Sequence, residues 1–410
     1  MSQAILKDIR GAVFRANPEY ELVTLDQLSP KQQTYLSMLT EQPDVFGLLR
    51  PRRGESRMIK TVSSEAAQVF NTLQQPGTLP FAAREQLARE RDPNRSLAEL
   101  VLDGVLEISA EEGFVSGAAA YHVIYRSAST PTARGTLATL SLQALQHAEL
   151  LPAQNPAALS LYLYNYNRLP LSLYWSRRLP STDAAAAYLG LESQSATGRK
   201  LHQFWVQSPG DNAASESGWR FWTRRSFHSY TETERPTYKL YVSPLPTHLP
   251  EVFSAAVEVF TAHDVAHFKV GKDAYGLLRP DKLIAYVDTM DALQAVAEDL
   301  RQRLSGIPAH GVPFTAELGL NGLLSWGIDP PSTEQSTAWK QRESWRLWIS
   351  NRLASALGEA RLQPAPTLAA WRFALERLRL DGVDPATWTP IDSLWEPAVS
   401  ARADKLEPIS

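Results

Sequence analysis

One stretch of the chain, residues 236–288, limits the possible folds more than any other. It holds two strand-like runs, residues 238–243 and 282–287, with an amphipathic helix between them. A polar and aromatic run, HFKVGKDAYGLLRP, follows the helix. This order of strand, helix and strand predicts an α/β unit. The cations on or beside the strands are Lys239, Lys269, Lys272, Arg279 and Lys282.

Two of these cations, Lys239 and Lys269, interrupt the apolar pattern expected of a packed strand. One interpretation is a site for an anion such as phosphate, which arginine holds with a planar fork and lysine with a point charge. The other is that both lysines lie on edge strands and discourage pairing with another chain. The pattern of residues leaves both interpretations open.

Length, charge and cysteine content exclude several classes of protein. A chain of 410 residues predicts two or three domains, and its net charge of −3 gives no overall electrostatic signature of nucleic-acid binding. The chain has no cysteine, which excludes disulfides, thiol catalysis and cysteine-ligated zinc. No apolar run is long enough for a membrane span, and the first residues do not look like a secretory signal. We therefore expect a cytoplasmic protein without nucleic-acid or membrane partners.

The N-terminal pattern predicts a winged-helix-like module over residues 1–126. Residues 1–40 look helical, with Ser29 and Pro30 placed as an N-cap and first helical residue. A strand, a turn and a strand follow over residues 45–63, then three helices, the third with Ser96 as its expected cap. A hairpin near residues 105–116 completes the module.

Two segments of this module, VFGLLRPRRGESRMIKTVS and SLAELVLDGVLEI, resemble the small domains that recognise leader peptides in ribosomal peptide maturation. The resemblance implies that this module holds a precursor peptide. The alternative is a winged helix used for packing or dimerisation. DNA recognition is disfavoured, because the third helix carries no arginine or lysine to reach base edges.

The whole chain is predicted to be α+β. A helical connecting region spans residues 136–217, and its polar end, residues 192–217, is expected to be a loop. An α/β domain spans residues 218–332, and helices fill residues 333–410.

The order KLYVS, helix, FKV, then an arginine and a lysine leading into LIAYV, resembles the phosphothreonine lyases of bacterial effectors. It also resembles the lyase domains of class III and IV lanthipeptide synthetases and the related lyases of class V pathways. The resemblance implies a lyase-like α/β domain and β-elimination of phosphate, with no metal or organic cofactor. It further implies a bacterial protein that acts on a phosphorylated precursor peptide.

The resemblance also implies roles for single residues. Lys269 matches the general base, and Lys239 and Arg279 match phosphate ligands, with Lys282 close by. Tyr241 stands where the effector enzymes carry a histidine as general acid, so Tyr241, His267 or His263 would supply the proton, or activity is lost. Later arginines would complete the phosphate site; the candidates are Arg342, Arg346 and Arg352.

Two further functions remain open. The chain lacks kinase motifs, so a lyase would depend on a separate kinase, and a cyclase is a further candidate partner. A protein that keeps the fold without the acid would be a non-catalytic peptide-binding or scaffold protein. The third alternative is a metal-dependent hydrolase, since His263 and His267 would share one face of a helix. No third ligand is recognisable, and histidines at the negative end of a helix explain the pattern as well.

An internal echo bears on Arg279. Residues 44–51, DVFGLLRP, match residues 273–280, DAYGLLRP, at six of eight positions. The repeated GLLRP suggests a turn that leads into a strand, with the arginine present for structure.

Overall fold

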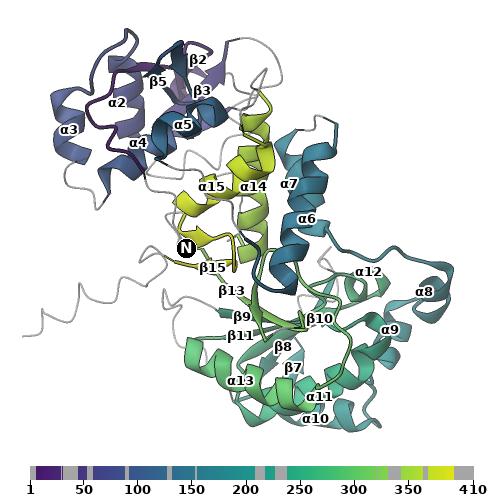
Figure 1. Cartoon of the computed structure of the whole chain (residues 1–410). Coiled ribbons are helices and arrows are strands. Elements are labelled where there is room, and N and C mark those ends of the chain that lie inside the picture. The colour runs from purple at the N-terminus through teal and green to yellow at the C-terminus, as the bar shows by residue number, and fades with distance from the viewer. Residues whose placement is uncertain are drawn as a thin grey trace, which may run out of the picture.

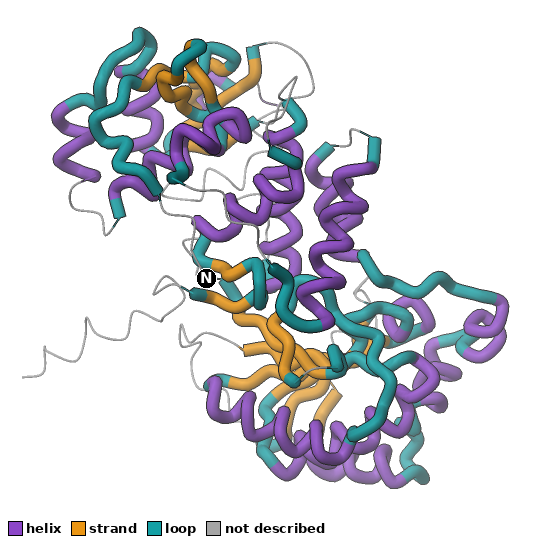
Figure 2. The backbone as a smooth tube through the Cα atoms, in the orientation of Figure 1, coloured by secondary structure: helices purple, strands orange, loops and turns teal. Residues whose placement is uncertain are grey.

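The computed structural model describes residues 6–28, 30, 45–52, 59–87, 92–126, 132–152, 155–207, 218–226, 238–319, 321–330, 343–362 and 368–391 (Figure 1). Helices and strands alternate along these residues, so the expected mixture of α and β structure is confirmed. Figure 2 shows a large sheet in one part of the molecule and smaller sheets elsewhere. Among the described helices, none has the length and apolar character needed to cross a membrane.

The N-terminal part combines short helices with two antiparallel three-stranded sheets, ordered β2-β3-β4 and β1-β5-β6. Its strands are β1 (Phe14–Ala16), β2 (Tyr20–Thr24), β3 (Gly47–Pro51), β4 (Lys60–Val62), β5 (Leu106–Ala110) and β6 (Gly113–Val115). Its helices are η1 (Leu25–Gln27), α2 (Ser64–Thr72), α3 (Phe81–Leu87), α4 (Pro93–Leu102), η2 (Gly117–Ala120) and α5 (Tyr121–Ile124).

The helix predicted over residues 1–40 is wrong where the structure describes it. Residues 14–16 and 20–24 are strands, because β1 pairs with β5 and β2 pairs with β3, partners far along the chain that no local pattern reveals. The expected cap Ser29 lies outside the described residues. Ser96 does not cap α4; Asp92 does, with its side chain accepting from the Arg95 N–H.

The hairpin predicted near residues 105–116 is confirmed as β5 and β6. It adds to β1, while β2, β3 and β4 form a separate sheet. The winged-helix arrangement itself stays a prediction.

The middle of the chain is largely helical, as expected. Its helices are α6 (Thr136–Leu150), α7 (Pro156–Asn165), α8 (Leu173–Arg178), α9 (Thr182–Tyr188) and α10 (Ala196–Phe204). The loop predicted over residues 192–217 is wrong in its first half, where α10 and β7 (Trp205–Gln207) lie. Ser195 caps α10, and the buried side chains of Leu201 and Trp205 anchor the segment in the core of the large sheet. Residues 208–217 lie outside the described residues.

The large sheet has seven antiparallel strands in the order β12-β13-β9-β11-β10-β8-β7. Apart from β7, its strands are β8 (Trp219–Arg224), β9 (Tyr238–Val242), β10 (His267–Gly271), β11 (Leu283–Val287), β12 (Ala316–Leu318) and β13 (Leu324–Ile328). The helices α11 (Leu249–Ala262) and α13 (Met290–Arg303) pack their apolar sides on one face of this sheet. In Figure 1 the other face looks toward α6, α7 and α14 (Trp345–Ala360). The short helices η4 (Pro246–His248) and α12 (Ala274–Leu277) lie in its connections.

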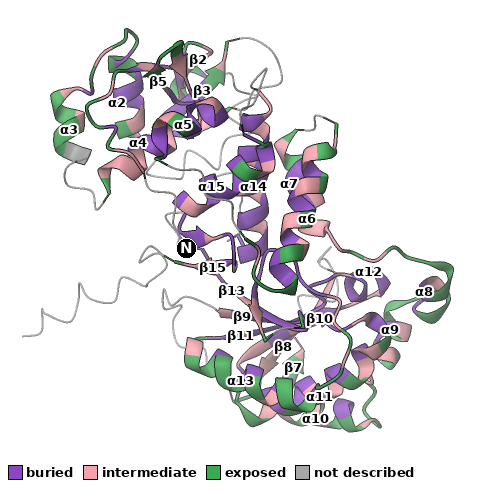
Figure 3. Ribbon diagram, in the orientation of Figure 1, coloured by how far each residue is buried: buried purple, intermediate pink, exposed green. Residues whose placement is uncertain are grey.

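The C-terminal helices join the N-terminal part to the sheet. They are α14 and α15 (Ala370–Leu380), followed by the short strands β14 (Val383–Asp384) and β15 (Thr389–Pro390). Figure 3 shows α14 largely buried, and it packs against α7 and α15. One hydrophobic core spans these helices and the N-terminal part, and a second lies under the large sheet. The boundaries expected for the four regions stay predictions.

Candidate active site

Both strand lysines lie in the interior of the large sheet. Lys239 is on β9, between β13 and β11, and Lys269 is on β10, between β11 and β8. The interpretation that these lysines protect exposed edges is therefore wrong. Both lie on the face opposite α11 and α13, because their strand neighbours Leu240 and Phe268 face the apolar core.

The register of the strands sets the neighbours of each lysine. Tyr286 on β11 is directly opposite Lys239 of β9 on one side and His267 of β10 on the other. Two residues away on β11, Ile284 lies between Tyr241 of β9 and Lys269 of β10. Residues two apart on a strand share a face, so these six side chains belong to one surface of the sheet.

Lys269 lies among aromatic rings. Its ammonium is 4.6 Å from the centre of the Trp219 ring and 5.6 Å from that of Tyr286. It makes no hydrogen bond or ion pair with the described residues. Burial, and then the charge of Lys239, lowers the pKa of the Lys269 amine from 10.5 to about 8. A lysine in this state can act as a base near neutral pH.

Lys239 is nearly buried and is paired with a carboxylate. Its ammonium donates to Oδ1 of Asp329, which follows β13. It also lies 5.6 Å from the centre of the Tyr286 ring, so that ring has a lysine ammonium at the same distance from each flanking strand. The two lysines therefore converge on one aromatic side chain.

Arg279 reaches the same cluster from the turn after α12. Its Nε and Nη2 donate to the two carboxylate oxygens of Asp281 at 2.8 and 2.9 Å, and Nη2 also donates to the Tyr164 hydroxyl at 2.9 Å. Its guanidinium lies 5.0 Å from the centre of the Trp219 ring that Lys269 also approaches. Nη1 makes no hydrogen bond with the described residues, so it remains a donor for a ligand.

Arg346 joins the cluster through Asp281. It is 1% exposed, and its Nη1 donates to Asp281 at 2.7 Å. Its Nε and Nη2 donate to the main-chain oxygens of Pro313 and Tyr164 at 3.3 and 2.8 Å. Each guanidinium nitrogen thus has a protein partner, so the structure places Arg346 as a support for Asp281 and Tyr164.

Two glycines, Gly276 and Gly327, allow the close packing that positions Arg279 and Arg346. A Cβ on Gly276 of α12 would lie 2.7 Å from the Gly218 carbonyl oxygen, which shows how tightly α12 packs before Arg279. A Cβ on Gly327 of β13 would lie 2.5 Å from the Trp345 ring, so only glycine lets α14 approach the sheet there. These contacts position Arg279 and Arg346 over one face of the sheet.

Lys282 does not join the cluster. It is fully buried, and its ammonium interacts with the Pro244 carbonyl at 3.0 Å and with Nδ1 of His310 at 2.8 Å. Burial lowers the pKa of Lys282 to about 7. No contact in the described part of the chain links its amine to Lys239, Lys269 or Arg279.

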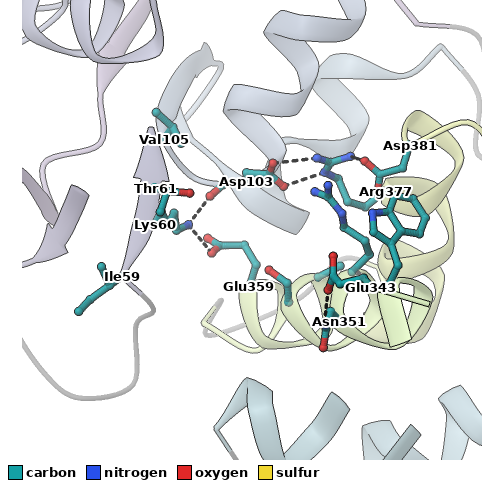
Figure 4. Close-up of a pocket in the computed structure, with 14 residues that line it drawn as sticks. Ile59, Lys60, Thr61, Asp103, Val105, Glu343, Asn351, Glu359, Arg377 and Asp381 are labelled. Carbon is teal, nitrogen blue, oxygen red and sulfur yellow. Dashed lines mark hydrogen bonds and ion pairs between the residues drawn. The ribbon is translucent and has the colours of Figure 1, made fainter. Parts of the chain in front are cut away.

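Arg352 also lies apart. Its guanidinium is 5.1 Å from the centre of the Trp348 ring, and Arg352 lines a cavity between β4 and the C-terminal helices. Charged residues of the N-terminal part, such as Lys60 and Asp103, also line that cavity, together with residues of α14 and α15 (Figure 4), and neither lysine of the large sheet does. Arg342, the other candidate, lies outside the described residues.

Two of the three candidate acids, Tyr241 and His267, differ in position. Tyr241 is 2% exposed and packs with Ile284 and Val312, and burial raises the pKa of its hydroxyl well above its usual value. His267 is half-buried beside Thr223, with its Nδ1 3.1 Å from the threonine hydroxyl. Burial lowers the pKa of His267, so its protonated form is disfavoured at neutral pH.

The shared helical face expected for His263 and His267 is wrong. Helix α11 ends at Ala262, and His267 opens β10. Nε2 of His263 lies 3.3 Å from Oδ2 of Asp299 on α13. Over the residues that the structure describes, no cluster of three or more histidines and carboxylates is arranged to hold a metal ion.

Several residues of the cluster were missed by the sequence interpretation. They are Tyr164, Trp219, Asp281, Tyr286 and Asp329. Asp281 had a signal, because it lies between Arg279 and Lys282 in the sequence. Tyr164 had a partial one, because three tyrosines at every second position cannot all face the core of α7.

The electrostatic balance of the cluster favours an anion. Its cations are Lys239, Lys269, Arg279 and Arg346, and its carboxylates are Asp281 and Asp329. Positive charge therefore exceeds negative charge when the lysines are protonated. In the part of the chain that the structure describes, the ammonium of Lys269 and Nη1 of Arg279 have no hydrogen-bond partner. An anion with several oxygens, such as phosphate, is the ligand that this set accommodates.

No protein-family model and no curated protein matches the sequence. Among solved structures, an effector protein from Pseudomonas syringae pv. tomato strain DC3000 is 15% identical, with a TM-score of 0.38 over 63% of this chain and 100% of that chain. A second effector, from Pseudomonas syringae pv. syringae strain 61, is 15% identical, with a TM-score of 0.37 over 63% and 99%. The type III effector and phosphothreonine lyase OspF from Shigella flexneri is 13% identical, with a TM-score of 0.24 over 47% and 98%. At such low similarity, the chemistry of this chain has to follow from its own residues.

Proposed function

We propose that this protein is a lyase that removes phosphate by β-elimination from phosphoserine or phosphothreonine in a peptide. The observation that carries the proposal is Lys269, a lysine on an interior strand with a pKa of about 8 and no ion-pair partner in the described residues. It lies beside Lys239 and Arg279, which provide positive charge for a phosphate. A base and an anion site in one place are what this elimination requires.

The reaction can be written with these residues. The neutral Lys269 amine takes the Cα proton, and the electrons of the C–H bond form the Cα=Cβ double bond. The Cβ–O bond breaks, and phosphate leaves with the electron pair of the Cβ–O bond. The products are a dehydroamino acid in the peptide, inorganic phosphate and protonated Lys269.

Departure of the phosphate is favoured by charge rather than by a dedicated proton donor. The ammonium of Lys239 and the guanidinium of Arg279 neutralise the charge that develops on the leaving oxygen. Tyr241 is poorly suited to donate a proton, because burial raises the pKa of its hydroxyl. In this proposal no metal or organic cofactor takes part.

The wider setting is also part of the proposal. The N-terminal module would hold a precursor peptide, as its resemblance to leader-peptide recognition domains implies. A separate kinase would phosphorylate the peptide, and a cyclase would use the dehydroamino acids, as in lanthipeptide biosynthesis.

A second candidate function is a non-catalytic peptide-binding or scaffold protein of the same maturation complex. The burial of Tyr241 favours it, because the position implied for the general acid holds a residue that gives up its proton reluctantly. Such a protein would bind phosphopeptides through the same cations without changing them.

Mass spectrometry separates these functions. The purified chain is incubated with phosphothreonine and phosphoserine peptides, including those encoded by neighbouring genes. Elimination removes the elements of phosphoric acid and leaves a product that adds a thiol, whereas hydrolysis restores the hydroxyl and adds no thiol. Binding without any change in peptide mass would support the scaffold, and hydrolysis would contradict the lyase.

A further inference from the structure

Asp281 connects the two arginines of the site, Arg279 and Arg346. It is 2% exposed and lies in the turn between α12 and β11. Its two carboxylate oxygens accept three hydrogen bonds, two from Arg279 and one from Arg346 of α14. Although burial opposes it, the two arginines hold the pKa of Asp281 well below its usual range. The carboxylate therefore stays charged at any working pH.

Asp281 binds Arg279 along one edge of the guanidinium, the edge formed by Nε and Nη2. Asp281 takes Nε and one N–H of Nη2, and the Tyr164 hydroxyl takes a further contact with Nη2. This bidentate arrangement fixes the plane of the guanidinium. The remaining edge, at Nη1, is left without a hydrogen bond to the described residues.

We propose that Asp281 is a positioning residue for elimination: it aligns Arg279 for the phosphate and sets the charge environment of Lys269. The inference rests on the proposed function, since it concerns the same site. Asp281 does not touch the reacting atoms in this scheme, and it acts through Arg279 and Lys269.

The effect on Lys269 follows from the charges around it. Lys239 of β9 and Arg279 disfavour its protonated form, while Asp281 and Asp329 favour it. Its other facing groups are the rings of Trp219 on β8 and Tyr286 on β11. Removing the negative charge of Asp281 therefore makes the Lys269 amine easier to deprotonate. The neutral base would then persist to lower pH.

The test compares Asp281→Asn and Asp281→Glu with wild type in kcat/KM for a phosphothreonine peptide as a function of pH. Asp281→Asn should lower kcat/KM by about a hundredfold, mainly through KM, because Arg279 loses its alignment. The acidic limb of the pH profile of kcat/KM for Asp281→Asn should also move to lower pH. Asp281→Glu keeps the negative charge but lengthens the side chain. The acidic limb of its pH profile should therefore stay at the wild-type pH, while KM rises.

A matched control separates this role from a contribution to folding. Asp103 holds Arg377 with the same two-bond geometry, at 2.7 and 2.8 Å, between α4 and α15. Asp103→Asn should leave the acidic limb and the KM of a short phosphopeptide unchanged. If Asp281→Asn also leaves both unchanged, or only lowers the folded fraction, the positioning role is refuted.

The two proposals fail in different ways. If wild-type protein eliminates no phosphate, the lyase function is wrong, and the role of Asp281 is then decided by direct titration of Lys269. Carbon-13 dimethylation of the lysines, with Lys269→Arg to assign the signal, gives its pKa by NMR. A lower pKa of Lys269 in Asp281→Asn would support the electrostatic role, and an unchanged or higher one would overturn it.

Discussion

Replacing Lys269 with arginine separates the base from the positive charge. Arginine keeps a cation that can lie near the Trp219 and Tyr286 rings, but it does not lose its proton at any working pH. In wild type, a pKa of about 8 leaves about a tenth of the Lys269 amines neutral at pH 7. The elimination rate should therefore rise with pH and level off above about pH 8.

We expect Lys269→Arg to reduce kcat by about 10²- to 10⁴-fold, the usual contribution of a positioned base. The assay is release of inorganic phosphate from a phosphothreonine peptide, followed from roughly pH 6 to 10. Peptide affinity is measured in parallel, because the retained charge should keep binding within about tenfold. Lys200→Arg on α10, where Lys200 pairs with Glu258, is the matched control and should leave the profile unchanged. Activity of Lys269→Arg within about tenfold of wild type would refute Lys269 as the base.

Further predictions concern stability and the other candidate residues. Lys269→Met should raise the stability at pH 7 by on the order of 1 kcal/mol, because wild type holds a lysine whose protonation is disfavoured. That gain should fade between pH about 8 and 10.5, where Lys269 loses its proton first in the folded and then in the unfolded chain. Urea unfolding at several pH values checks this prediction. Tyr241→Phe should keep kcat within about threefold, since its hydroxyl makes no hydrogen bond with the described residues; a loss above about a hundredfold would make Tyr241 the acid. Arg346→Met should lower the free energy of unfolding by about 3 kcal/mol, because it breaks a buried pair with Asp281, and a change below about 1 kcal/mol would contradict this account. Arg352→Ala should leave the KM of a short phosphopeptide within about twofold, as steady-state kinetics would show, whereas a large increase would return Arg352 to the phosphate site.

Local patterns predicted the elements of the central stretch well. The strand with Lys239, the helix after it and the strand expected over residues 282–287 lie where apolar alternation and helical periodicity placed them. Helix caps are also local: the Thr289 side chain accepts from the Ala292 N–H at the start of α13, although the cap expected at Ser96 was wrong. These features depend on residues within a few positions of one another.

Prediction failed where distant partners decide the structure. Residues 14–16 became a strand because β5 lies beside them, although their own pattern looked helical. The polar segment 196–204 became a helix because Leu201 has a core to enter. Neither partner can be read from the segment itself, since strand pairing and burial are long-range interactions.

The repeated pentapeptide GLLRP shows the same limit of prediction from local sequence. At residues 47–51 the pentapeptide is strand β3, paired on both sides. In the second copy, Gly276 and Leu277 belong to helix α12, and Arg279 turns toward Asp281. One sequence thus takes two conformations, because the surrounding contacts and not the pentapeptide choose between them. The suggestion that the repeated segment is a shared turn into a strand is therefore wrong.

By itself, the sequence determined that this chain has a strand–helix–strand centre with lysines at two unusual positions and no cysteine chemistry. Only the tertiary structure decided which cations meet. It brought Lys239, Lys269 and Arg279 around shared aromatic rings. Lys282 instead contacts His310, and Arg352 lines a cavity elsewhere. The physical reason is that alternation along a strand fixes the face of a side chain, whereas the order of strands and the packing of α14 fix what lies opposite that face.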